Sequence, residues 1–306
     1  MKDRSTPARN HLAASSIDRA AHLRGNEDAL SDMLRSGRAR IVLVSGDRVG
    51  MTDDGQRVAA IEPGLLPWGS PDPFFLGITG DGPLFAMDVT GGPAGRREGP
   101  RRLPEKVQFR PLRSMAPSLA AEDAGVAAYA MGLCNWHRAT PRCCGCGEPT
   151  AVKMGGHVRF CAGCNREHFP RTDPAVIMLV SDGDRCLLSH QAEWPGRMYS
   201  TLAGFVEPGE SLETAVIREV KEETGVAVSD VRYHSSQPWP FPASLMIGFT
   251  ARYEAGEVTP QSGEILDARW FSRAGLDAAI RRQEVSLPPR VSIAYRLIRD
   301  WMGSAP

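Results

Sequence analysis

The chain has 306 residues, and its 36 basic and 36 acidic side chains give a formal net charge of zero. This balance does not suggest a general nucleic-acid-binding or membrane-binding surface. No run of 18 apolar residues occurs, so we expect no membrane span. A single core rarely extends over this length, which favours two domains and a small additional module.

The first 139 residues fall into three segments. Residues 1–25 lack the continuous apolar stretch of a secretory signal, which predicts a disordered arm and a cytoplasmic protein. Residues 26–117 carry short apolar runs separated by Gly and Pro, and this pattern predicts a β-rich domain. Residues 118–139 are rich in Ala and contain no Pro, so we expect a connecting helix.

Residues 140–170 contain two C-x-x-C pairs, with 14 residues between them in the sequence. Each pair fits a tight turn in which two thiolates converge on one cation, and two such turns complete a tetrahedral site of the kind that suits Zn²⁺. All four positions would then be protein ligands, so the metal is expected to be structural. Cys144 lies too close to Cys146 for an ordinary turn of this kind, which favours Cys143. The predicted ligands are Cys143, Cys146, Cys161 and Cys164.

Residues 171–306 alternate apolar runs with helical segments, which predicts a mixed α/β domain. The segment "GFVEPGESLETAVIREVKEETGV" (204–226) includes an acidic helix, with Ser211 as its N-cap and Gly225 at its end. At about 100° per residue, Glu219 and Glu223 share a face with apolar side chains, and Glu222 lies at the edge of that face. A divalent cation would relieve the repulsion between such carboxylates. The alternative is a solvated surface helix whose glutamates pair with neighbouring cations.

This segment resembles the whole box motif of the Nudix hydrolases, from Gly204 through Glu210 and "REVKEETGV". The resemblance implies a Nudix α/β/α sandwich with a mixed sheet. It also implies Mg²⁺- or Mn²⁺-dependent hydrolysis of a nucleoside diphosphate linked to a second group. Catalytic roles are implied for Arg218, Glu219, Glu222 and Glu223, and Arg218 would orient a glutamate by an ion pair. The general base is not assigned among the glutamates.

The proline-rich stretch "SQPWPFPAS" (236–244) combines a restricted backbone with aromatic faces that can stack on bases. A rigid loop that plugs the core is the alternative. Downstream of a Nudix box, this stretch resembles the signature of the NADH pyrophosphatase (NudC) subfamily. A preceding four-cysteine zinc ribbon and a β-rich N-terminal domain are also typical of that subfamily.

The subfamily resemblance implies hydrolysis of NADH or NAD to AMP and NMNH or NMN, removal of NAD caps from RNA 5′ ends, and a homodimer. It adds two metal ligands to the box glutamates, the Ala203 carbonyl group and Glu264. In the subfamily, an aromatic ring at the position of Phe169 stacks on a base of the substrate. This ring comes from the other subunit of the homodimer. The substrate-binding residues that the resemblance implies are Phe169, Phe205, Gln237, Pro238, Trp239, Pro240, Phe241, Pro242, Ala243, Ser244 and Ala294.

Two other functions remain open from the sequence. One is a Nudix hydrolase that acts on ADP-ribose or a dinucleoside polyphosphate, since the box specifies the chemistry and not the substrate. The other is a protein without catalysis that uses its zinc ribbon for interaction. A test of several substrates would distinguish them.

Overall fold

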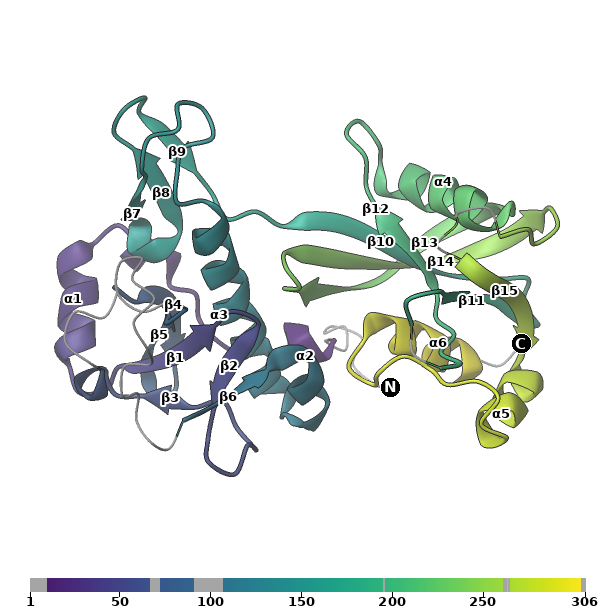
Figure 1. Ribbon diagram of the computed structural model, residues 1–306, viewed down its shortest axis with the longest axis horizontal. Helices are drawn as coiled ribbons and strands as arrows, with labels where there is room; N and C mark the ends of the chain where they lie inside the picture. Colours follow the sequence, from purple (N-terminus) through teal and green to yellow (C-terminus); the bar gives the residue numbers. More distant parts are fainter. Residues whose placement is uncertain are drawn as a thin grey trace, which may run out of the picture. The chain divides into compact units, whose positions relative to one another are not determined.

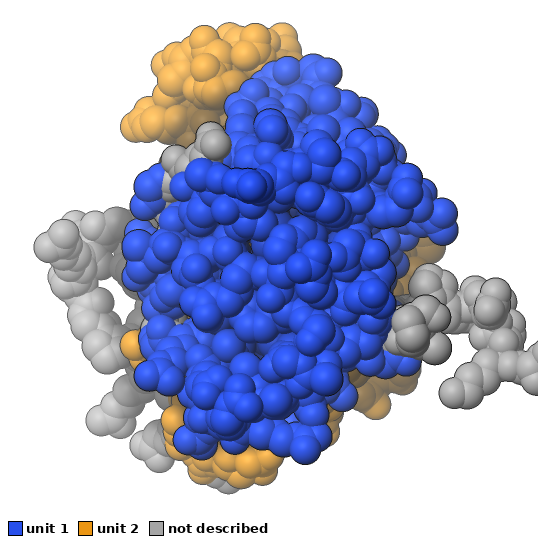
Figure 2. Space-filling view, turned by 90° about the vertical axis from the view of Figure 1, so that its right-hand side faces the viewer, with its two compact units in different colours: residues 1–11, 173–237, 244–306 blue, residues 12–172, 238–243 orange. Residues whose placement is uncertain are grey.

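The computed structural model describes residues 10–66, 72–90, 107–194, 196–260, 263 and 265–303. The chain divides into two compact units, which Figure 2 colours separately. Unit 1 comprises residues 1–11, 173–237 and 244–306, and unit 2 comprises residues 12–172 and 238–243. The proline-rich stretch is therefore divided between the units, because its central residues 238–243 belong to unit 2 and the residues on either side belong to unit 1.

Unit 1 contains a mixed six-stranded sheet in the order β13-β14-β10-β11-β15, with β12 paired to β10. Strands β10 and β14 are parallel, whereas β10 pairs antiparallel with β11 and β12. The strands are β10 (Asp173–Ser181), β11 (Arg185–Gln191), β12 (Leu202–Phe205), β13 (Ala227–Trp239), β14 (Ser244–Ala255) and β15 (Ile265–Ser272). The helices are α4 (Leu212–Thr224), α5 (Arg273–Arg281) and α6 (Ile293–Gly303).

Alternating side chains of the central strand β10 build two cores. Val176 and Met178 pack in one core with Val216 of α4, whereas Ile177 packs in the other with Leu297 of α6. Successive side chains of a strand point to opposite faces of the sheet, so α4 and α6 cover opposite faces (Figure 1). Unit 1 is thus the expected α/β/α sandwich with a mixed sheet.

Unit 2 also contains a six-stranded sheet, in the order β4-β5-β1-β2-β6, with β3 paired to β1. Strands β1 and β5 are parallel. The strands are β1 (Arg40–Ser45), β2 (Arg48–Met51), β3 (Ala60–Ile61), β4 (Phe74–Thr79), β5 (Gly82–Asp88) and β6 (Gln108–Pro111). The helices are α1 (Glu27–Arg35), α2 (Leu112–Met115) and α3 (Ala121–Ala139).

Helices α1 and α3 pack on this second sheet. Leu30 of α1 joins Ile41 of β1 and Phe75 of β4 in one core, and α3 packs against β1, β4 and β5. The cysteine segment forms a separate small sheet of β7 (Ala151–Lys153), β8 (Val158–Cys161) and β9 (Arg166–His168).

The region before α1 differs from the disordered arm that the sequence led us to expect for residues 1–25. Residues 11–13 and 21–23 form short 3-10 helices, and the side chains of Leu12 and Ala20 are buried. Apolar side chains spaced too widely for a periodic pattern are still buried here by tertiary contacts. Residues 1–9 lie outside the described part. Among the described helices, none combines the length and the apolar character needed to span a membrane.

Candidate active site

Helix α4 begins and ends where its sequence predicts. The Ser211 side chain accepts a hydrogen bond from the Thr214 backbone N–H and so caps the first turn. Gly225 ends the helix with φ of 75°, a left-handed conformation that glycine adopts at little cost. These caps fix the rotational position of α4, and with it the direction in which each glutamate points.

The three box glutamates differ in exposure, as their positions around the helix predict. Glu223 is 5% exposed, the Glu219 side chain is 14% exposed, and the Glu222 side chain is 60% exposed. Buried carboxylates are costly unless a cation or hydrogen-bond donors compensate them. The structure therefore excludes a fully solvated helix, whereas the pairing of glutamates with Arg218 that this alternative included is present.

Arg218 connects the helix to the loop before it. Its Nε and Nη2 atoms donate to the two oxygens of Glu210 at 2.6 and 2.8 Å, and Nη1 donates to Glu219 and Glu222 at 2.8 and 2.9 Å. Nη2 also donates to the Phe205 carbonyl oxygen at 2.9 Å. The hydrogen bonds from Arg218 lower the pKa of Glu210 to about 2, so this bidentate pair stays ionised at neutral pH. Arg218 thus holds the carboxylates of Glu210, Glu219 and Glu222 in place.

A cavity of about 670 Å³ lies beside these carboxylates within unit 1. It is lined by Ala175, Ala203, Gly204, Phe205, Glu207, Glu219, Glu222, Glu223, Ser244, Met246 and Gly263. Most of the residues predicted to hold the metal, namely Ala203 and the three box glutamates, therefore line one cavity. Glu264 lies outside the described residues.

The residues present fit a hydrated divalent cation. Strand β12 passes so close to α4 that a Cβ on Gly204 would lie 1.9 Å from the Glu219 carboxyl carbon, so only glycine leaves room for that carboxylate. The glutamates line the cavity wall and do not form a closed cage. Mg²⁺ commonly binds through one or two carboxylates and completes its shell with water and substrate phosphate.

The proline-rich stretch does not line this cavity as a whole. Ser244 does so, whereas Pro240, Phe241 and Pro242 line a second cavity of about 340 Å³ within unit 2. The Asn135 amide of α3 donates to the Pro240 and Pro242 carbonyl oxygens at 3.0 and 2.8 Å. Unit 2 therefore fixes the backbone of this loop. The sequence offered no local signal for Asn135, because the contact joins residues about 100 positions apart.

Gln237, which the resemblance implies as a substrate contact, is held by hydrogen bonds within unit 1. Its side chain is fully buried, its Nε2 donates to the Val291 carbonyl oxygen at 2.7 Å, and its Oε1 accepts from the Ile293 N–H at 2.9 Å. These two bonds tie Gln237 to the backbone around the start of α6, and its contact with substrate stays a prediction. In the same turn, the Ala294 side chain is buried in the core.

The aromatic side chains at the predicted stacking positions are open to solvent. Phe169 is 63% exposed and Phe205 is 60% exposed. The rings of Trp239 and Phe241 instead meet edge to face, with centroids 5.1 Å apart, and the Arg113 guanidinium lies 5.7 Å from the Trp239 ring centroid. Trp239 and Phe241 are thus partly engaged with each other, whereas Phe169 and Phe205 are available to a ligand or a second subunit.

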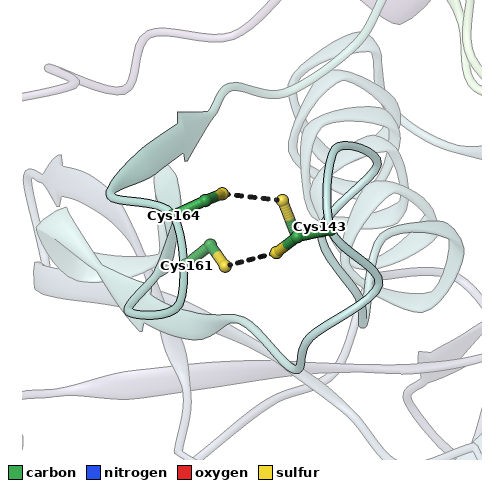
Figure 3. A group of neighbouring side chains, drawn as sticks. Cys143, Cys161 and Cys164 are labelled. Carbon is green, nitrogen blue, oxygen red and sulfur yellow. Dashed lines mark hydrogen bonds between the residues drawn. The ribbon is translucent and has the colours of Figure 1, made fainter.

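The four predicted cysteines converge. Their Sγ atoms all lie within 4.8 Å of one another, and the Cys143–Cys164 and Cys146–Cys161 distances are 3.5 and 3.4 Å. Figure 3 shows the side chains of Cys143, Cys161 and Cys164 pointing toward a common centre. Among the described residues, these cysteines are the one group of three or more His, Cys, Asp or Glu side chains whose ligand atoms lie this close together.

Hydrogen bonds within the cluster shift the pKa values of its cysteines in opposite directions, since the bond with Cys143 raises the pKa of Cys164 to about 12 whereas the pKa of Cys143 is lowered. The Gly145 backbone N–H donates to the Cys143 Sγ, and this bond is the main cause that lowers the Cys143 pKa to about 5. Cys144 points to His168 instead and is not part of the cluster, as its spacing had indicated. The four cysteines are therefore positioned to hold a metal ion.

Comparison with known proteins agrees with this geometry. Residues 171–289 match the NUDIX domain, and residues 38–136 match the NADH pyrophosphatase-like rudimentary NUDIX domain. The chain is 38% identical to the NAD-capped RNA hydrolase NudC of Mycobacterium bovis BCG Pasteur, over 97% of this chain and 95% of that protein. The chain belongs to the NADH pyrophosphatase (NudC) subfamily of the Nudix hydrolases. The same-named protein of Stutzerimonas stutzeri is 41% identical over 72% of this chain and 73% of its own length.

A third relative is longer than this NudC-subfamily chain. The NAD-capped RNA hydrolase NUDT12 of Macaca fascicularis is 43% identical over 61% of the chain, and the match spans only 44% of the length of that relative. The rudimentary NUDIX match also explains why the first domain has a sheet like that of a Nudix domain. The sequence had indicated strands there, but not their order.

Proposed function

We propose that this chain hydrolyses the pyrophosphate bond of NADH or NAD to give AMP and NMNH or NMN, and that it removes NAD caps from RNA 5′ ends. The observation that carries the proposal is the cavity beside α4, whose lining includes Ala203, Glu219, Glu222 and Glu223. Relatives that bear the name NAD-capped RNA hydrolase, one of them aligned over 97% of the chain, support the choice of substrate.

Mg²⁺ or Mn²⁺ would be held by the Ala203 carbonyl group and by Glu219, Glu222, Glu223 and Glu264. Such an ion supplies a polarised water and neutralises the charge of the phosphates. The protein supplies the positions of these ligands, because Arg218 fixes Glu219 and Glu222 and is itself fixed by Glu210. Zn²⁺ would be held by the four cysteines in a closed tetrahedral site that leaves no ligand position open for a substrate.

We also propose that the residues which the subfamily resemblance implies contact the substrate. Ser244 and Phe205 belong to the wall of the carboxylate cavity, and the segment 238–243 would contact the nucleotide through its aromatic rings. Phe169 is exposed at the end of the ribbon and would stack on a base bound in the second subunit of a homodimer. The backbone at Ala294 would contact the substrate near the start of α6. A cytoplasmic location stays a prediction.

A substrate panel tests the proposal. Purified protein is incubated with NADH, NAD, ADP-ribose, a dinucleoside polyphosphate or an NAD-capped short RNA, with Mg²⁺, Mn²⁺ or EDTA, and the products are separated by chromatography. We expect AMP with NMNH or NMN from the dinucleotides, 5′-phosphate RNA with NMN from the capped RNA, and no product in EDTA. If only ADP-ribose or the dinucleoside polyphosphate were cleaved, the proposal that NADH, NAD and NAD-capped RNA are the substrates would be refuted. No cleavage of any compound by folded protein would refute catalysis and favour an interaction role for the ribbon.

A further inference from the structure

A second polar cavity of unit 1 is lined mainly by the start of α6. Its volume is about 290 Å³, and its walls are formed by Asn10, His11, Arg290, Val291, Ser292, Tyr295, Arg296 and Arg299. The described lining contains three arginines and no carboxylate. In a chain whose net charge is zero, this concentration of guanidinium groups creates a local site for anions.

The three arginines are not equivalent. Arg296 lies 3.5 Å from a carboxylate oxygen of Asp300, so its charge is partly compensated. Arg290 and Arg299 are exposed, and within the described residues neither forms an ion pair. Two guanidinium groups at the cavity rim are therefore free to bind phosphate oxygens, which they match in geometry.

The floor of the cavity is held by a buried polar residue. Asn10 is 5% exposed, and its Nδ2 donates to the Ser235 hydroxyl and the Ser236 carbonyl oxygen at 3.0 and 2.8 Å. Its Oδ1 accepts from the Arg296 Nη1 at 3.1 Å, which fixes that guanidinium against the wall. The site is thus preorganised by hydrogen bonds across distant parts of the sequence, unlike a group of mobile surface arginines.

The cavity adjoins the segment that precedes the proline-rich loop. Asn10 bonds to Ser235 and Ser236 at the end of β13, and the next residue, Gln237, bonds to Val291, which lines the cavity. An aromatic side chain, Tyr295, also lines the wall. A ring beside guanidinium groups favours single-stranded nucleic acid over a free phosphate or an acidic peptide, because it offers a face on which a base can stack.

We propose that this cavity binds the phosphodiester backbone of single-stranded RNA beyond the 5′ cap. Arg290 and Arg299 bind the phosphates, Arg296 and Asn10 shape the floor, and Tyr295 contacts a base. The inference rests on the proposed function for its substrate. It predicts that the chain acts on a capped RNA more efficiently than on a free dinucleotide.

The test compares two double variants of the full chain. Arg290→Ala with Arg299→Ala removes the proposed phosphate-binding groups, and Arg281→Ala with Arg282→Ala removes the same charge from the end of α5, where both arginines are exposed and paired with acids. For each protein, kcat/KM is measured with NADH and with an NAD-capped 20-nucleotide RNA over a series of salt concentrations. Binding of the same RNA with a 5′-phosphate is measured by fluorescence anisotropy, so that the site is tested independently of catalysis.

We expect the first variant to show kcat/KM and affinity for the RNAs reduced by about tenfold, with at most a twofold change for NADH. Its salt dependence should weaken by about 1.4 in slope, because each phosphate that is no longer neutralised accounts for about 0.7. Equal reductions in the control variant, an equal reduction with NADH, or a reduced affinity for inorganic phosphate alone would overturn the proposal. If the wild-type protein cleaves neither substrate, the proposed function fails. The RNA-binding site is then still supported if anisotropy shows weaker RNA binding for the first variant than for the control, and is contradicted if the two variants bind alike.

Discussion

The two units of this chain build the same sheet and differ in what lies against it. Unit 1 has the strand order β13-β14-β10-β11-β15 with β12 on β10, and unit 2 has β4-β5-β1-β2-β6 with β3 on β1. In chain order the strands correspond one to one, including the parallel pairs β10–β14 and β1–β5. Helix α6 packs on β10 and β14, as α3 does on β1 and β5.

The difference lies in the connection before the fourth strand of each sheet. In unit 1 it contains α4 with its glutamates. In unit 2 the corresponding residues 62–73 contain only two acidic residues, Glu62 and Asp72, and their described part forms one short 3-10 helix. Helix α1, which precedes the sheet in the chain, packs on it instead, through Leu30 and its apolar neighbours.

This comparison separates fold from chemistry. A sheet of this order is stable with either helix on its face, because burial of apolar side chains depends on shape and hydrophobicity. The proposed catalysis requires carboxylates at defined positions, and the connection that contains α4 supplies the glutamates proposed for this role. The second unit retains a structural role, since its α3 holds the proline-rich loop and its chain continues into the cysteine ribbon.

The sharpest difference between the units is expected at Gly204. In Gly204→Ala the new Cβ meets the Glu219 carboxylate, which must move out of the cavity. We expect NADH hydrolysis to fall at least about 100-fold, as for loss of a positioned catalytic carboxylate, with little change in folding. Gly64→Ala in unit 2 is the control, because its Cβ meets nothing within 4 Å. Activity near wild type in Gly204→Ala would show that the position of Glu219 is unimportant.

Loss of the metal from the ribbon comes next in size. Cys161 is fully buried in the four-cysteine cluster, whereas Cys144 is exposed outside it. In Cys161→Ala we expect bound zinc to fall from one ion per chain to none and Tm to fall by at least about 5 °C. Cys144→Ala should keep both values. Equal zinc content in the two variants, measured by atomic absorption, would contradict the assignment of the ligands.

The structural role of unit 2 is tested by removing the hydrogen bonds that hold the loop. Asn135→Ala removes two hydrogen bonds to the carbonyl oxygens of Pro240 and Pro242. Since each such bond contributes about 1 kcal/mol, the two together contribute about 2 kcal/mol, and we expect KM for NADH to rise by up to roughly 30-fold while kcat changes less. Asn135→Asp, which cannot donate, should behave like the alanine variant, and Asn135→Gln should recover part of the loss. A fall in kcat alone would show that the loop does not serve substrate binding.

A smaller effect is expected in the pH dependence of the stability of unit 2. Burial lowers the pKa of His137 and His157 in unit 2 to about 4. The neutral His137 ring is satisfied on both sides, since Nε2 donates to the Gly156 carbonyl oxygen and Nδ1 accepts from Arg159. The unfolded chain binds protons near pH 6.5 and the folded chain does not, so stability falls as pH drops from about 6.5 to 4.

Thermal unfolding from pH 7 to 4 measures this dependence. In His137→Gln, which lacks the titrating ring, we expect Tm to decline less steeply over this range than in the wild type. The same slope in both proteins would show that protonation of His137 does not limit the stability of unit 2.

The sequence predicted those features of the candidate sites that depend on residues close together in the chain. The caps of α4, the inward direction of Glu223 and the convergence of the cysteines all follow from spacing within short segments. The arginine–glutamate contact across the N-terminus of α4 was implied by the box motif, and the structure identifies Glu210 as its principal partner.

Contacts between distant residues could not be predicted in this way. The order of the first sheet depends on the parallel pairing of β1 with β5, and the burial of Gln237 depends on hydrogen bonds to Val291 and Ile293. Helix α1 was missed because its nine residues lie inside a region with the composition of strands and turns. The sheet order and the burial of Gln237 depend on interactions that form only once the chain has folded, whereas α1 carries a local signal in its Asn26 N-cap.

The most direct test of the account compares one glutamate from each corresponding connection, Glu223→Gln in unit 1 and Glu62→Gln in unit 2. Hydrolysis of NADH with Mg²⁺ or Mn²⁺ is followed by chromatography, and circular dichroism confirms that both variants fold. The account predicts a loss of roughly 100- to 10,000-fold for Glu223→Gln and a change of at most about twofold for Glu62→Gln. Undiminished hydrolysis by Glu223→Gln would contradict the claim that catalysis resides in the carboxylates of α4.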